Sequence, residues 1–195
     1  MRTRAALPRR LALPAFSAAL VLVPGAGSPA ASEAAAAWEA LRPGAIVLFR
    51  HATAPGTGDP SGMRLGDCST QRNLDEAGRA QARRIGEAVR AQGVAVGAVL
   101  ASRWCRAAET ADLAFPGRAR PEPAFDSFFA ERGEGPARTA EARRILLGWS
   151  GPGALVVVTH QVNITALTGV VPSSGEGVVL RRGGGDLVVV GRVKP

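Results

Sequence analysis

The sequence predicts an α/β fold with a largely parallel central sheet. Three short apolar runs, at 45–49 (AIVLF), 96–102 (VGAVLAS) and 154–160 (ALVVVTH), are typical of strands buried on both faces. Segments with helical periodicity separate these runs, and an alternation of strands and helices favours parallel pairing. The length of 195 residues suits one folded domain with a sizeable core.

Glycine, proline and capping residues predict the boundaries of the other elements. Residues 52–72 are rich in Gly, Pro, Ser, Thr and Asp, which predicts a long loop, and such a loop directly after a central strand is typically functional. Pro43-Gly44 and Gly93 are expected to end helices, and Thr139 is a candidate helix cap. We expect helices at 32–44, 73–93, 105–115 and 139–150, a short helix from 163 to 169, an extended segment at 117–125, and a closing hairpin of 177–182 and 186–193 around GGGD.

The first 31 residues have the pattern of an export signal. Four arginines and no acid precede an apolar stretch at 11–23 that is too short to span a bilayer comfortably, and small residues follow up to Ala31. We predict a signal peptide at 1–31 and one exported domain at 32–195, periplasmic or extracellular, without a stable membrane anchor after cleavage. The alternative is an uncleaved anchor, and Arg9-Arg10 also permits a twin-arginine route.

The formal net charge of +8 comes almost entirely from arginine, since Lys194 is the only lysine. A basic chain raises the question of nucleic-acid binding. The absence of tyrosine, the low aromatic content and the predicted export argue against that class of partner.

Cys68 and Cys105 are the only cysteines. An even pair in a chain bound for an oxidising space predicts a disulfide, the alternative being two buried free thiols. The bridge would close a loop of about 38 residues and stabilise the fold by roughly 3–4 kcal/mol.

The conspicuous polar residues follow the ends of the three predicted buried strands, in FRHAT, LASRWCR and VVTHQVN. In parallel sheets, ligands bind beyond the carboxyl ends of the strands. If these ends are neighbours, they bring Arg50, His51, Arg106 and His160 to one place.

Two guanidiniums and two imidazoles suit a phosphate ester. The forked donors of arginine match phosphate oxygens, one imidazole nitrogen can attack phosphorus, and the other ring can donate hydrogen bonds. A structural role is the alternative for each histidine. A metal site lacks a third ligand at suitable spacing, and no G-x-S-x-G segment indicates a serine hydrolase. We therefore expect neither a metal nor a cofactor.

Four segments resemble, in order, the signatures of the histidine phosphatase (phosphoglycerate mutase-like) superfamily. LFRHAT is similar to its R-H-G signature, and RNLDEAGRAQA to its L-T-x-x-G-x-x-Q-A segment. LASRWCRAAETA and VVVTHQVNITAL are similar to its arginine-bearing and late histidine-bearing segments. The resemblance spans 45 to about 170 and implies a three-layer α/β/α sandwich that needs no metal.

Carried over by position, the resemblance implies that His51 is the nucleophile that forms a phosphohistidine. Arg50, Arg106 and His160 would complete the phosphate pocket. Ala52 stands where the family has glycine, and Gln161 stands where one branch of the family has an aspartic acid proton donor.

Because Gln161 cannot donate a carboxylic proton, the acid must come from the middle of the chain, as in the other branch. Glu131 is the preferred candidate, followed by Asp126, with Glu134 also open. Arg64 and Arg72 of the long loop are candidates for a second anionic group of the substrate. We expect an exported phosphomonoesterase acting on a small phosphorylated substrate. The alternatives are an envelope sugar phosphatase, similar to those of the lipopolysaccharide core, and a catalytically silent binder of phosphate esters.

Overall fold

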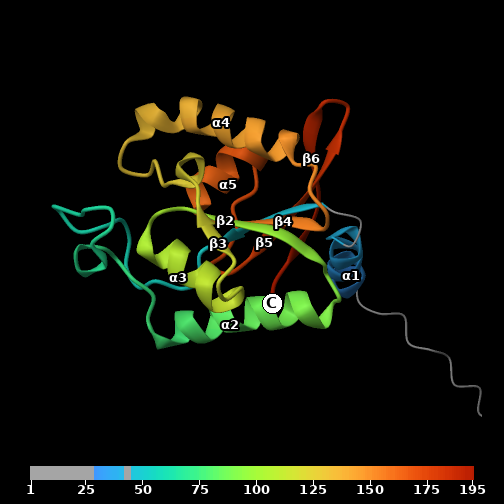
Figure 1. Cartoon of the computed structure of the whole chain (residues 1–195), viewed down its shortest axis with the longest axis horizontal. Helices are drawn as coiled ribbons and strands as arrows, with labels where there is room; N and C mark the ends of the chain where they lie inside the picture. Colours follow the sequence, from blue (N-terminus) through green and yellow to red (C-terminus); the bar gives the residue numbers. More distant parts are fainter. Residues whose placement is uncertain (1–28, 42–44) are drawn as a thin grey trace, which may run out of the picture.

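Six strands form one sheet in the computed structural model, which describes residues 29–41 and 45–195 (Figure 1). The order across the sheet is β3-β2-β4-β1-β5-β6, so β4 lies between the other two long apolar strands. The strands are β1 (Ile46–Arg50), β2 (Val96–Ala101), β3 (Ala119–Pro121), β4 (Ala154–Thr159), β5 (Gly177–Gly183) and β6 (Asp186–Val193).

The sheet is mixed, and the prediction of a largely parallel sheet is confirmed in part. β3, β2, β4 and β1 pair parallel to one another, whereas β5 pairs antiparallel with β1 and β6 antiparallel with β5. The hairpin explains the second antiparallel pair: Gly184 and Gly185 form a two-residue turn with positive φ angles of 60° and 82°, and a turn this short forces neighbouring strands to run in opposite directions.

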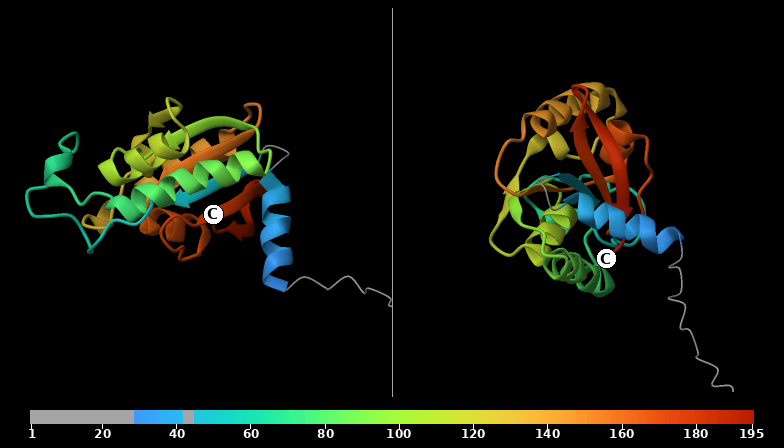
Figure 2. Two further views of the ribbon diagram at one scale, coloured as in Figure 1. Left: turned by 90° about the horizontal axis from the view of Figure 1, so that it is seen from below. Right: turned by 90° about the vertical axis from the view of Figure 1, so that its right-hand side faces the viewer.

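Helices cover both faces of the sheet. α2 (Glu76–Ala91) and α3 (Cys105–Ala114) lie on one face, and α4 (Gly135–Gly148) and α5 (Gln161–Thr168) lie on the other (Figure 1). α1 (Pro29–Leu41) packs against β6, at the end of the molecule opposite the long loop after β1 (Figure 2). Short 3₁₀ turns occur at Cys68–Thr70, Pro123–Phe125 and Arg132–Glu134.

The core has two halves that meet at β1. Val47 and Phe49 belong to a cluster with apolar residues of α1, α2 and α3. Ile46 and Leu48, which point the other way, belong to a cluster with residues of α4 and α5. Because successive side chains of a strand point to opposite faces, a strand covered on both sides must be apolar throughout, which is the pattern that the sequence shows.

The element boundaries differ from the predictions mainly at helix starts. Thr139 is not the cap of α4, because the helix already begins at Gly135, with Pro136 in the first turn where a missing N–H costs nothing. α5 begins at Gln161, directly after His160, and ends at Thr168, where Gly169 caps it with φ +74°. The predicted stop at Pro43-Gly44 and residues 1–28 of the predicted signal lie outside the described residues.

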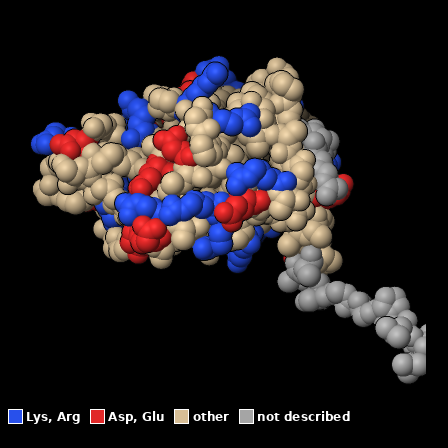
Figure 3. All heavy atoms as spheres, turned by 60° about the horizontal axis from the view of Figure 1, so that its bottom comes forward, with Lys and Arg blue, Asp and Glu red and all other residues tan. Residues whose placement is uncertain are grey.

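No helix in the described ranges is long and apolar enough to cross a membrane. On the face shown in Figure 3, arginines lie among acidic side chains. Among the ion pairs of the described residues, Arg79 pairs with Glu76 and Glu109. Basic and acidic side chains are therefore interspersed on this face.

Gly86 of α2 lies close to the end of α3. A Cβ at this position would overlap the carbonyl of Ala114. Alanine favours a helix over glycine by about 1 kcal/mol, whereas overpacking costs about 1–3 kcal/mol. We expect Gly86→Ala to lower the free energy of unfolding, measured by urea denaturation.

The matched control is Gly148→Ala, at the exposed end of α4, where a Cβ would meet nothing within 4 Å. This variant is expected to keep or slightly gain stability. Equal effects of the two substitutions would contradict the close packing of α2 on α3.

Candidate active site

The three strand ends meet at one edge of the sheet. Arg50 pairs with Thr159 in the parallel register of β1 and β4. The His51 N–H donates to the Thr159 carbonyl at 2.9 Å, and the Ser102 N–H donates to the Val158 carbonyl at 3.0 Å. The backbone that follows each strand is therefore fixed to its neighbour, and the first polar residues of all three ends lie together.

A cavity of about 830 Å³ opens at this edge. Arg50, His51, Arg106 and His160, the four residues that the sequence singles out, all line it. Glu131 and Glu134 line it as well, from the segment before α4. The expected meeting of these side chains is thus found in the structure, while their chemical roles remain a proposal.

His51 is buried and held in one tautomer. Its Nδ1 lies 2.7 Å from the Ala52 carbonyl, which can only accept, so Nδ1 carries the ring proton and Nε2 keeps its lone pair. Burial lowers the pKa of His51 to about 3, and the positive charges of Arg106 and Arg50 act in the same direction. The ring is therefore neutral at neutral pH, with a lone pair on Nε2.

His160 is orientated by Ser102. Its Nε2 lies 2.8 Å from the Ser102 hydroxyl, which is 3.3 Å from the carboxylate of Asp126. We assign the hydroxyl proton to the shorter contact, so that Nδ1 of His160 carries its ring proton. Burial lowers the pKa of His160 well below its usual value, with the His51 ring, 5.4 Å away between centroids, acting in the same sense.

Three buried nitrogens of the cavity lack a partner among the described residues. They are Nε of Arg50, Nε of Arg106 and Nδ1 of His160. Arg50 is fixed by donating from Nη1 to the Pro172 carbonyl at 3.0 Å. An unsatisfied buried donor costs about 1–3 kcal/mol, so this set suits a ligand that is rich in acceptor oxygens.

The candidate acids occupy different environments. Asp126 does not line the cavity: it is fully buried, and its carboxylate accepts from the backbone N–H of Arg103 at 2.8 Å and from the Arg103 side chain at 2.7 Å. Asp126 is therefore held by Arg103 outside the cavity, which removes it as a candidate proton donor. Glu134 lines the cavity but is paired with Arg138. Of the three candidate acids, Glu131 lines the cavity and has no salt bridge among the described residues.

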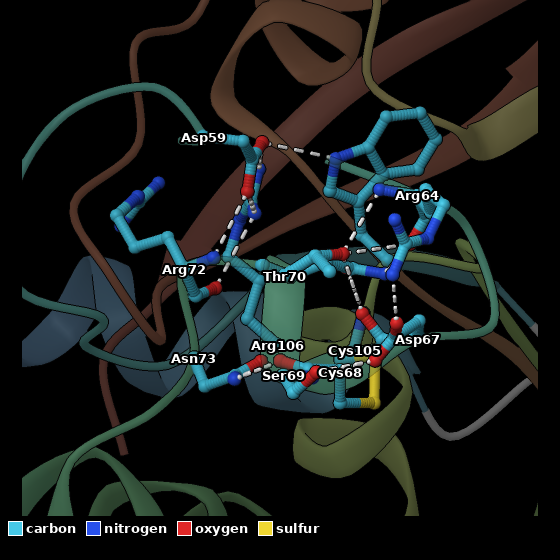
Figure 4. The surroundings of a disulfide bond; sticks show 12 residues. Asp59, Arg64, Asp67, Cys68, Ser69, Thr70, Arg72, Asn73, Cys105 and Arg106 are labelled. Atoms are coloured by element: carbon cyan, nitrogen blue, oxygen red, sulfur yellow. Dashed lines mark hydrogen bonds and ion pairs between the residues drawn. A yellow bond between two sulfur atoms is a disulfide. The ribbon is translucent and has the colours of Figure 1, made fainter. Parts of the chain in front are cut away.

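The predicted disulfide is present and joins Cys68 to Cys105 (Figure 4). Cys105 is the first residue of α3 and directly precedes Arg106, so the bridge ties the long loop to the helix that carries this arginine. Arg72 lines the cavity, as the prediction for a second anionic contact requires, whereas Arg64 is exposed and pairs with Asp67.

Three residues of the site escaped the sequence analysis. Asp59 and Trp104 line the cavity, and Ser102 contacts His160 from behind. Ser102 had a signal, since it follows β2 at the same edge as His51 follows β1. Asp59 had none, because it lies in a loop whose path the local sequence does not specify. In the described ranges, no three His, Cys, Asp or Glu side chains are grouped as metal ligands.

A sequence model of the histidine phosphatase superfamily (branch 1) matches residues 46–151, more than half of the chain. The chain therefore belongs to the histidine phosphatase superfamily. The matched region includes Arg50, His51, Arg106 and Glu131. No curated protein is similar enough in sequence to count as a relative.

Solved structures with similar folds include phosphatases and a phosphoglycerate mutase. The protein histidine phosphatase SixA complexed with tungstate has a TM-score of 0.53 at 17% identity, over 77% of this chain and 97% of that one. Phosphoserine phosphatase from Entamoeba histolytica, in complex with 3-phosphoglyceric acid, has a TM-score of 0.56 at 12% identity, over 77% of this chain and 97% of that one. Phosphoglycerate mutase from Thermus thermophilus has a TM-score of 0.50 at 19% identity, over 76% of this chain and 98% of that one. At these identities the likeness shows the fold alone.

Removing the disulfide should destabilise the protein measurably. Its sequence separation is 37 residues, for which loop closure predicts a loss of roughly 3–4 kcal/mol on replacing Cys68 and Cys105 together by serine. Urea unfolding of the oxidised wild type and the double variant measures the difference. Wild type reduced by dithiothreitol is the control and should match the variant; an unchanged midpoint in both would show that the bridge contributes nothing.

Proposed function

We propose that this protein is an exported phosphomonoesterase that works through a phosphohistidine on His51. The observation that carries the proposal is the set of three unpartnered buried nitrogens, on Arg50, Arg106 and His160, in the cavity that also contains His51. A phosphoryl group presents three non-bridging oxygens that can accept from them. The membership of the histidine phosphatase superfamily supports the same chemistry.

The first half-reaction transfers the phosphoryl group to the protein. The lone pair on Nε2 of His51 forms the P–N bond while the P–O ester bond breaks, and its electron pair leaves with the alkoxide. The arginines and His160 donate to the phosphoryl oxygens and stabilise the negative charge of the transition state. A neutral His51 is essential here, because an imidazolium has no lone pair to donate.

Glu131 supplies the proton that the leaving alkoxide needs. Hydrogen bonding to Arg138, and then to Glu131, lowers the pKa of Glu134. Arg138 therefore keeps Glu134 ionised, which leaves Glu131 as the candidate acid at the cavity wall that can donate the proton. A general acid must reach the cavity that holds the leaving group, and Glu131 lines that cavity.

The second half-reaction returns the protein to its initial state. Glu131, now ionised, takes a proton from a water molecule, the water oxygen bonds to phosphorus, and the P–N electron pair returns to His51. The products are the alcohol and inorganic phosphate. No step of this scheme uses a metal or a cofactor.

Export is the second part of the proposal. It is supported by the basic and apolar start of the sequence and by the pairing of both cysteines in a disulfide, which persists in oxidising compartments. The substrate then belongs to the periplasm or the cell exterior, which favours phosphorylated sugars and other small envelope esters over cytoplasmic phosphoglycerates.

The nucleophile is tested by His51→Ala. This variant should lose turnover of phosphate esters and any acid-labile labelling by a ³²P-labelled donor, because no other group on the scheme can form the P–N bond. Labelling is measured by rapid quench at neutral to alkaline pH. Asn73→Ala, in the segment that precedes α2, is the control and should keep both; turnover of His51→Ala within about tenfold of wild type would overturn the mechanism.

The proton donor is tested by Glu131→Gln with two leaving groups. A sugar phosphate has a poor leaving group and should lose about 10²–10⁴-fold in kcat, whereas an aryl phosphate, whose leaving group hardly needs a proton, should be nearly spared. Stopped assays with both substrates give the ratio.

Equal losses on both substrates would assign Glu131 to substrate positioning, and no loss on either would move the donor to Glu134. If the wild type binds phosphate esters but turns over only aryl phosphates, slowly, the protein is the silent binder instead.

A further inference from the structure

Asp59, in the long loop, makes the most extensive set of contacts to Arg106. Its Oδ1 accepts from Nη1 of Arg106 at 2.6 Å, and its Oδ2 accepts from Nη2 at 3.1 Å (Figure 4). Arg106 is only 3% exposed, so this forked pair is shielded from water on the arginine side. Charge-assisted forks of this kind fix the plane of a guanidinium as well as its position.

Asp59 is itself held by groups other than Arg106. The backbone N–H of Arg72 donates to Oδ1 at 3.2 Å, and the indole N–H of Trp104 donates to Oδ2 at 3.1 Å. The Arg72 side chain closes the loop around Asp59 by donating to the Gly58 carbonyl at 2.7 Å and to the Ala54 carbonyl. The carboxylate therefore has a fixed place that does not depend on the arginine it binds.

The charge state of Asp59 agrees with this arrangement. Burial raises the pKa of Asp59, but the hydrogen bond and charge of Arg106, with smaller contributions from Arg72 and Trp104, lower it below its usual value. Asp59 is thus an ionised counter-ion within a cavity that has to receive an anion.

The contacts divide the donors of Arg106 into two groups. Nη1 and Nη2 donate to Asp59, and Nη1 also reaches the Arg72 carbonyl at 3.4 Å. Nε is buried and has no partner among the described residues. Asp59 therefore occupies one edge of the guanidinium and leaves the Nε edge for another acceptor.

We propose that Asp59 is a positioning residue, which holds Arg106 so that its Nε edge binds the phosphoryl group. This inference rests on the proposed function of the cavity as a phosphate site. Trp104 connects the same carboxylate to the second donor, because its ring packs edge-on at 5.7 Å from the ring of His160. Asp59 thereby contacts Arg106 directly and is linked to His160 through the ring of Trp104.

Simple electrostatics makes the opposite prediction. Removing a negative charge from an anion site should tighten anion binding, because the repulsion disappears. If Asp59 acts by positioning, its loss should weaken binding despite the gain in positive charge. The sign of the change therefore separates the two roles.

The experiment measures the affinity of the folded, oxidised protein for inorganic phosphate by isothermal titration calorimetry. Asp59→Asn should weaken phosphate binding about 10- to 100-fold, as expected for the loss of one charged hydrogen-bonded partner. Asp59→Glu, which keeps the carboxylate, should recover part of the affinity. With an aryl phosphate, Asp59→Asn should lower kcat as well as raise KM, because Arg106 acts in the transition state.

Glu134→Gln is the matched control, since it removes the same charge from the wall of the same cavity and its partner is Arg138. Phosphate binding to this variant should be unchanged or tighter. Trp104→Phe is a second test that changes no charge: loss of the indole donor to Asp59 should weaken phosphate binding about 2- to 10-fold. This variant keeps the proposal testable if Asp59→Asn does not fold.

Two failures are distinguishable. If wild type binds phosphate and Asp59→Asn binds it equally or more tightly, Asp59 does not position Arg106, and the proposed phosphatase function stands. If neither wild type nor Glu134→Gln binds phosphate, the cavity is not a phosphate site, and both the function and this inference are wrong.

Discussion

The parallel pairing of β1 and β2 with β4 is the constraint on which the site depends. Residues 51, 102 and 160 are far apart in the chain, yet each follows a strand end at the same edge of the sheet. Hydrogen bonds from His51 and Ser102 to the carbonyls at the end of β4 extend this pairing one residue past the strands. The geometry of the candidate site is thus a continuation of the backbone ladder, and the apolar core on both faces holds that ladder in register.

The same edge concentrates positive charge around neutral rings. Burial lowers the pKa of His51 most, and the charges of Arg106, Arg50 and Arg72 each lower it further. The arginines of the proposed phosphate site therefore also keep the His51 ring unprotonated. The positive charge of these arginines favours an anionic ligand in the pocket and also favours the neutral form of His51. The affinity of the pocket for anions and the protonation state of His51 are therefore coupled.

The sequence predicts the strands, the meeting of the two histidines and the cysteine pair, because each has a local signal. Apolar runs of strand length mark β1, β2 and β4, and a histidine or arginine after each run marks the edge. The antiparallel side of the sheet and the role of Asp126 were not predictable in this way. Asp126 looks like any loop acid until the fold buries it against Arg103 and Ser102, and Asp59 meets Arg106 only through the path of a long loop.

That loop explains why polar and covalent contacts matter so much here. Between residues 55 and 70 no residue is buried, so hydrophobic packing contributes little to its order. Its position rests on the disulfide, on the Asp59–Arg106 pair and on the bonds from Arg72 to two carbonyls of the loop. Two of these three ties end on Arg106 or on the residue before it. The cavity wall and Arg106 are consequently ordered by the same few interactions, and a change that frees the loop also frees this arginine.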